Sequence, residues 1–184
     1  QPFAIVVIKR VEAAKFCKDY LEKAGFDNIK ILESAPTRGS VVCRWKGTEQ
    51  ASGEKAALCL LAHLDVVPAD DEKWDEDPFS GKITDEYIWG RGALDCKGMV
   101  ASELMAAILL KRTGFQPRKD IILAFTADEE VGGDFGLDFL AKNNWEDIED
   151  KLTINEGGGI LLPIGSDPKD YIVKKKKKGV FWTK

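Results

Sequence analysis

Apolar side chains recur along the chain with two kinds of spacing, and the two alternate. Helical spacing runs through residues 11–24, where Gly25 is the expected stop, and again through 98–112 and 135–143. Short apolar runs typical of strands occupy 29–32, 41–45, 56–62, 121–125 and 152–154. The run at 56–62 is continuously apolar, which predicts a strand covered on both faces. The alternation predicts an α/β fold with a mixed, largely parallel sheet flanked by helices.

The polar segments predict the connections. Pro36 and Gly39 mark a turn between the first two strands, residues 68–81 read as a loop, and 82–89 as a short hairpin. The run of lysines at 174–178 is interpreted as a solvated surface or a guard on an edge strand, with an interaction patch as the alternative.

Composition narrows the class of protein. With 184 residues, 44% hydrophobic, 32% charged and a net charge of −4, the chain is expected to form a globular domain that does not bind nucleic acid. It has no apolar run near the roughly 20 residues of a membrane span and no signal-peptide layout, so we expect a cytoplasmic protein. Its four cysteines, which are far apart, are interpreted as reduced thiols and not as a disulfide framework or a zinc knuckle: Cys17, Cys43, Cys59 and Cys96.

The chain contains one histidine, so no site within it can use two. His63 follows the buried strand at 56–62, and Asp65 lies two residues further, on the same side of an extended chain. A carboxylate that holds one ring nitrogen leaves the other free for a metal ion. The alternative is a buried His–Asp pair with a purely structural role.

A glycine-rich turn at 90–98 carries Asp95 into the strongest predicted helix. It matches neither the dinucleotide-binding nor the P-loop pattern, and its acid would repel a phosphate. The turn either delivers Asp95 into a cavity or places it as the cap of the following helix.

Two more acidic segments follow predicted strands. Asp128, Glu129 and Glu130 come after the strand at 121–125, and Glu156 comes after the strand at 152–154. Three adjacent carboxylates are tolerated at a solvated helix start or around a divalent cation. For the segment that carries Glu156, taken alone, a simple turn is the favoured interpretation.

Taken together, these strand ends point to one ligand site. In open α/β sheets, ligands bind outside the carboxyl ends of the strands. One histidine with several carboxylates suits zinc, manganese or cobalt, and carboxylates can bridge a pair of ions in hydrolytic sites.

The motifs resemble those of the M20 metallopeptidases, which include aminoacylase, acetylornithine deacetylase, succinyl-diaminopimelate desuccinylase and the carboxypeptidase and dipeptidase branches. The resemblance rests on five segments in the family's order: LAHLDVVP at 61–68, Trp74 with PFSG at 78–81, GRGALDCKG at 90–98, DEEVGG at 128–133 and NEGG at 155–158.

This resemblance implies which residues bind the metal ions. His63 and Glu156 would bind one metal ion, Asp95 would bridge both ions, and Glu130 would bind the other. The implied cofactor is zinc, two ions in a complete enzyme, with cobalt or manganese as alternatives.

The resemblance also implies two catalytic roles. Glu129 would be the general base that takes a proton from the metal-bridging water and later passes it to the leaving amine. Asp65 would orient His63. The implied reaction is hydrolysis of an amide or peptide bond next to a free carboxylate, in an N-acyl amino acid or a small peptide.

The sequence departs from the family in two respects. A full member has a second metal-binding histidine near its C-terminus and an inserted lid domain that often forms the dimer, and this sequence shows neither. We therefore expect residues 1–184 to be the N-terminal part of a catalytic domain, dimeric only if the lid is present and inactive if the second histidine is missing. Alternatives are a non-catalytic metal-binding fragment or interaction module and, more remotely, a phosphate-binding domain.

Overall fold

The computed structural model describes residues 2–49, 57–70 and 73–156, with side chains from residue 11 onward. The lysine run at 174–178 lies outside these residues, so its interpretation stays a prediction. Within the described part, no helix has both the length and the apolar character needed to cross a membrane.

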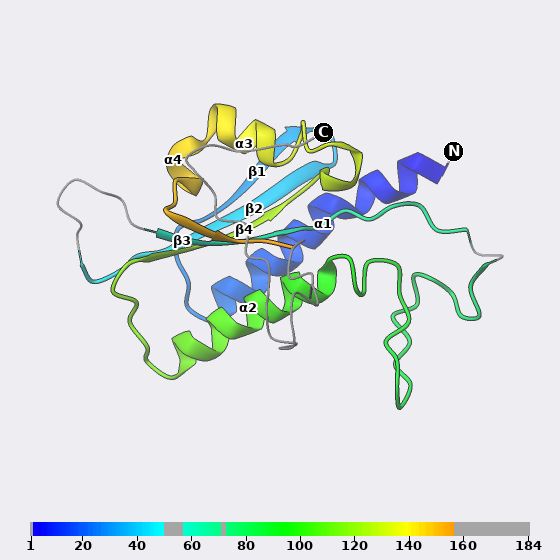
Figure 1. The fold of residues 1–184 in the computed structure, drawn as a ribbon, viewed down its shortest axis with the longest axis horizontal. Coiled ribbons are helices and arrows are strands. Elements are labelled where there is room, and N and C mark those ends of the chain that lie inside the picture. Colours follow the sequence, from blue (N-terminus) through cyan, green and yellow to red (C-terminus); the bar gives the residue numbers. More distant parts are fainter. Residues whose placement is uncertain (1, 50–56, 71–72, 157–184) are drawn as a thin grey trace, which may run out of the picture.

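A five-stranded mixed sheet forms the centre of the molecule (Figure 1). Its spatial order is β1 (Ile29–Ala35), β2 (Arg38–Trp45), β4 (Asp120–Thr126), β3 (Ala57–His63) and β5 (Leu152–Ile154). β3 runs parallel to β4 and to β5, whereas the β1–β2 and β2–β4 pairs are antiparallel. The predicted mixed sheet is confirmed, and its parallel part is the half that contains β4, β3 and β5.

The antiparallel half follows from a short connection. β1 and β2 are separated by only Pro36 and Thr37, and a two-residue link can join only antiparallel neighbours. Gly39, expected in this turn, instead pairs with Glu33 inside the hairpin.

Helices cover both faces of the sheet (Figure 1). α1 (Pro2–Lys23) and α2 (Lys97–Arg112) pack on one face, and α3 (Leu137–Asn143) and α4 (Trp145–Ile148) pack on the other. α1 begins at Pro2, well before the expected start at Val11, and α3 begins at Leu137, after the expected start at Phe135.

β4 shows why the central strands read as continuous apolar runs. Leu123 and Phe125 belong to the core under α1 and α2, whereas Ile122 and Ala124 belong to the core under α3 and α4. All four are 0% exposed. Because successive side chains point to opposite faces, a strand with helices on both sides needs apolar residues at every position.

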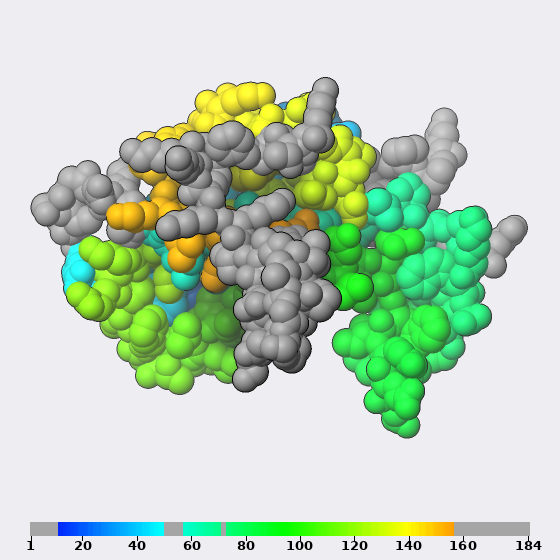
Figure 2. Space-filling model, in the orientation of Figure 1, coloured from blue at the N-terminus to red at the C-terminus, as the bar shows by residue number. Residues whose placement is uncertain are grey.

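The expected hairpin at 82–89 is present. Ile83 and Ile88 form an antiparallel bridge, and the Trp89 N–H donates to the carbonyl of Lys82 at 2.8 Å. Figure 2 shows the hairpin projecting from the body of the molecule, and both of its isoleucines are exposed.

α2 carries one acid that the sequence pattern hides. Glu103 is only 8% exposed, and neither of its carboxylate oxygens has a hydrogen-bond partner among the described residues. Burial raises the pKa of Glu103 from 4.5 to about 7, because the ionised form loses its hydration without gaining a partner.

We therefore predict that Glu103 makes the stability of the protein depend on pH. The pKa of Glu103 is higher in the folded than in the unfolded state. Its contribution to the free energy of unfolding is therefore fully present below about pH 4.5 and is lost as the pH rises through about 7. Glu103→Gln should remove this loss and raise the free energy of unfolding at pH 8 by up to about 3 kcal/mol. Denaturant unfolding at pH 5 and pH 8 measures the difference.

Glu12→Gln is the matched control, because the Glu12 side chain is 66% exposed. An equal pH dependence in the wild type and in Glu103→Gln would contradict the prediction.

Candidate metal centre

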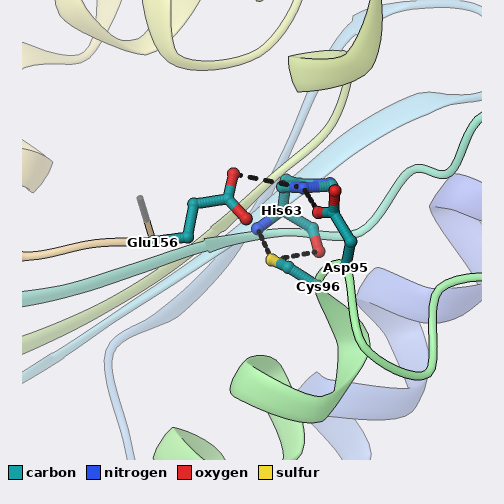
Figure 3. Close-up of side chains that lie close together, drawn as sticks. All are labelled: His63, Asp95, Cys96 and Glu156. Atoms are coloured by element: carbon teal, nitrogen blue, oxygen red, sulfur yellow. Dashed lines mark hydrogen bonds and ion pairs between the residues drawn. The ribbon is translucent and has the colours of Figure 1, made fainter. Parts of the chain in front are cut away.

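Three parallel strands bring the predicted site residues together at their carboxyl ends. His63 is the last residue of β3, the turn η2 (Glu129–Val131) follows β4, and Glu156 follows β5. The loop before α2 brings Asp95 to the same place (Figure 3). The site therefore forms where ligand sites of α/β sheets usually lie.

The histidine ring has a defined orientation. His63 is 2% exposed, and its Nδ1 lies 3.0 Å from the main-chain carbonyl oxygen of Asp65. A carbonyl oxygen can only accept, so Nδ1 carries the hydrogen and the lone pair of the neutral ring lies on Nε2.

Three carboxylates face that Nε2 atom. Oδ1 of Asp95 lies at 3.0 Å, Oε1 of Glu156 at 3.3 Å and Oε2 of Glu129 at 3.8 Å (Figure 3 draws the first two). A lone pair opposite carboxylate oxygens is repulsive, so a positive charge between them is needed, either a proton on Nε2 or a metal ion.

The pKa of His63 reflects the same demand. Burial acts to lower this pKa, but hydrogen bonding to Asp65 and Cys96 and the negative charge of Glu156 outweigh burial. The resulting pKa lies well above that of an ordinary histidine, because the surroundings favour a cation.

The acids of the site also repel one another. The pKa values of Glu129, Glu130 and Glu156 are all raised. Burial is the largest cause in each case, and the nearby charge of Asp95 adds to it, while His63 acts in the opposite direction. A bound cation would relieve this repulsion.

One group of donors fits a single metal ion. His63, Asp95, Cys96 and Glu156 each offer a ligand atom, and these atoms lie within 4.8 Å of one another. Nitrogen, carboxylate oxygen and sulfur are the donors that divalent zinc and similar ions take in proteins. Three of the four predicted ligands are therefore brought together, whereas Glu130 lies outside this group.

Asp65 acts on two neighbours. Its carboxylate, expected to hold the imidazole, lies 3.5 Å from Nδ1, and the closer acceptor is its own carbonyl. The two carboxylate oxygens accept the N–H groups of Glu129 at 3.0 Å and Glu130 at 3.1 Å. Asp65 thus orients the ring through its main chain and holds the turn that carries both glutamates through its side chain.

Asp95 does not cap the helix that follows it, which was the alternative to a place in the site. The N-cap residue of α2 is Cys96, and no side chain caps the helix start. The Asp95 carboxylate instead lies 3.0 Å from Nε2 of His63.

The acidic triplet does lie at a helix start, with Asp128 as the N-cap of η2, but this first acid is not solvated. Asp128 is 1% exposed, has a left-handed φ of 76°, and is paired with Arg38. It also accepts the N–H of Phe135 at 3.1 Å, and the Arg38 guanidinium lies 4.4 Å from the centre of the Phe135 ring. Asp128 and Arg38 support the turn that carries Glu129, a role that the sequence pattern did not reveal.

Gly92 explains how the Asp95 loop reaches the site. Its φ is +87°, and a Cβ added there would collide with the side chain of Val66, just beyond Asp65. The glycine-rich pattern thus serves close packing of two loops. Cys96 was missed as a site residue, although its position directly after Asp95 was the available signal.

Comparison with known proteins places this geometry in a family. Residues 59–173 match the model of peptidase family M20/M25/M40. The chain belongs to this family. The resemblance noted in the sequence is therefore confirmed.

Individual relatives agree with the assignment. The chain is 40% identical over 129 residues to a probable carboxypeptidase S-like 2 of Dictyostelium discoideum, covering 67% of this chain and 24% of the relative. It is 33% identical over 147 residues to aminoacylase-1 of Sus scrofa, covering 79% of this chain and 35% of the relative. The chain thus spans about a quarter to a third of the length of these relatives.

A solved structure supports the fold. An M20 family metallo-carboxypeptidase from Sulfolobus solfataricus superposes with a TM-score of 0.60 at 27% identity, covering 82% of this chain and 33% of that chain. The mixed sheet flanked by helices is therefore the fold of this M20 catalytic region.

We predict that Asp65→Asn destabilises the protein, because an amide group would face the Glu129 or Glu130 N–H with a donor instead of an acceptor. Loss of one charge-assisted hydrogen bond at a buried site should lower the free energy of unfolding by about 2 kcal/mol. Denaturant unfolding in the presence of a chelator isolates this effect from metal binding.

Asp70→Asn provides the comparison, since the Asp70 side chain is 55% exposed and forms an exposed ion pair with Lys73. Equal stability of the two variants would show that the Asp65 carboxylate does not hold the turn.

Proposed function

We propose that this chain forms part of a metal-dependent hydrolase that cleaves an amide or peptide bond next to a free carboxylate. The proposed substrates are N-acyl amino acids or short peptides. The observation that carries the proposal is the convergence of the Asp95 and Glu156 carboxylates, at 3.0 and 3.3 Å, on Nε2 of the single histidine, His63. Membership of a peptidase family supports it.

The chain's own residues supply the proposed metal ligands. His63, Asp95 and Glu156 would hold one ion, and Glu130 together with Asp95 would hold a second. We propose zinc, with cobalt or manganese as alternatives. The bound metal would lower the pKa of the attacking water and polarise the scissile carbonyl.

Glu129 is the proposed general base. Its Oε2 lies 3.8 Å from Nε2 of His63, close to the metal ligands but outside the group of four. Its side chain is 42% exposed, so a substrate can reach it. Burial raises its pKa, which suits a group that takes a proton from water and passes it to the leaving amine.

We predict that Glu129→Ala abolishes turnover by the full protein while leaving metal affinity unchanged. Loss of a general base typically lowers the rate by about 10²–10⁴-fold. Hydrolysis of a panel of N-acyl amino acids and dipeptides gives the rate, and calorimetric titration with zinc gives the affinity.

Glu86→Gln is the control, because Glu86 lies on the exposed hairpin away from the metal ligands. Retained turnover in Glu129→Ala would refute the assigned role.

A second candidate function is metal binding without hydrolysis. It is favoured by the position of Glu130 outside the group of His63, Asp95, Cys96 and Glu156. Such a module would hold one ion.

The two functions differ in metal content. For the non-catalytic module we predict one tightly bound zinc ion per 184-residue chain after dialysis, and no hydrolysis of the same substrate panel. Elemental analysis of the purified chain measures the stoichiometry. Two ions per chain together with hydrolysis would exclude the module and support the enzyme.

A further inference from the structure

The last residue of β3, His63, lies beyond the end of the hydrogen-bonded ladder between β3 and β5. In a strand, the N–H and C=O of one residue point to one side and those of the next residue point to the other. The Leu64 N–H donates to the Thr126 carbonyl in β4 at 2.7 Å, so the N–H and C=O of His63 point away from β4. On that side the ladder with β5 ends at the Leu60–Ile154 pair, before His63 is reached.

The thiol of Cys96 takes the place of a strand partner there. The His63 N–H donates to Sγ at 3.2 Å, and Sγ–H donates to the His63 carbonyl at 3.6 Å (Figure 3). Cys96 is 2% exposed, so water does not compete for these groups.

The same residue is tied to α2. The Cys96 carbonyl accepts the N–H groups of Met99 at 3.0 Å and Val100 at 3.1 Å, which begins the helix. Cys96 therefore joins the end of the strand that carries His63 to the start of the helix that follows Asp95.

We infer that Cys96 is a positioning residue of the metal centre: its thiol holds the main chain of His63 so that Nε2 stays aligned with Asp95 and Glu156. The thiol donates its hydrogen to the His63 carbonyl and accepts from the His63 N–H. The inference rests on the proposed function for the metal, whereas the contacts between Cys96 and His63 stand without it.

Three variants of the full chain test this inference. Cys96→Ala removes both hydrogen bonds, and Cys96→Ser keeps a donor and an acceptor on a smaller atom. Cys17→Ala is the matched control, because Cys17 is 3% exposed in the core between α1 and the sheet and lies outside the metal group.

Two measurements are made on each variant. Zinc affinity is measured by competition with a chromophoric chelator, and exchange of the His63 amide is measured by NMR in metal-free protein. Loss of an outer partner of a metal ligand typically costs about 10–100-fold in affinity. We expect that loss, with faster exchange of the His63 amide, in Cys96→Ala. We expect clear recovery in Cys96→Ser, and wild-type zinc affinity in Cys17→Ala even where its melting temperature falls.

Three results would overturn the inference. The first is wild-type zinc affinity in Cys96→Ala, and the second is an unchanged exchange rate of the His63 amide. The third is a thiolate-to-metal charge-transfer band in the cobalt-loaded wild type that Cys96→Ser lacks, because it would make Cys96 a ligand. A wild type that binds no zinc would contradict the proposed function, while amide exchange would still decide the role of Cys96.

Discussion

The lone pair on Nε2 of His63 faces carboxylate oxygens of Asp95 and Glu156 at 3.0 and 3.3 Å, and this cluster is stable only with a positive charge inside it. The carbonyl of Asp65 sets that requirement, because it can only accept from Nδ1 and so directs the lone pair to the other side of the ring. The histidine ring is buried, whereas the Asp95 side chain is 66% exposed, so the ring cannot turn away from the carboxylates that meet it. The electrostatics of the site therefore call for a positive charge on or beside Nε2, from a proton or a metal ion, before any relative is considered.

Much of the surrounding structure keeps these like charges close together. The Asp65 carboxylate accepts the amides of Glu129 and Glu130, so one residue serves both the histidine and the turn after β4. The Arg38–Asp128 ion pair holds the start of that turn, and the thiol of Cys96 joins the end of β3 to α2. Each support combines a polar group with main-chain groups at the end of an element, where the regular hydrogen-bonding ladder has stopped.

Several elements could be predicted because their patterns are local. The apolar run at 121–125 gave β4, since helices on both faces require an apolar residue at every position. The periodic run at 98–112 gave α2, because a helix that packs one face on the sheet needs apolar residues at helical spacing. Boundaries were less predictable: α3 begins after Phe135, whose N–H is bound by Asp128 and whose ring lies under Arg38, contacts that are distant in sequence.

The sequence by itself determined the class of fold, the strand ends that bear His63 and Glu156, and the Asp95 loop, because strand periodicity and the placement of acids are read locally. Only the tertiary structure decided how these groups meet. It placed Cys96 against the main chain of His63, gave the ring contact to the Asp65 carbonyl, and left Glu130 outside the group of four donors. The physical reason is that a hydrogen bond or ligand geometry depends on distances of a few ångströms between elements, and such distances are set by packing across the sheet and not by spacing along the chain.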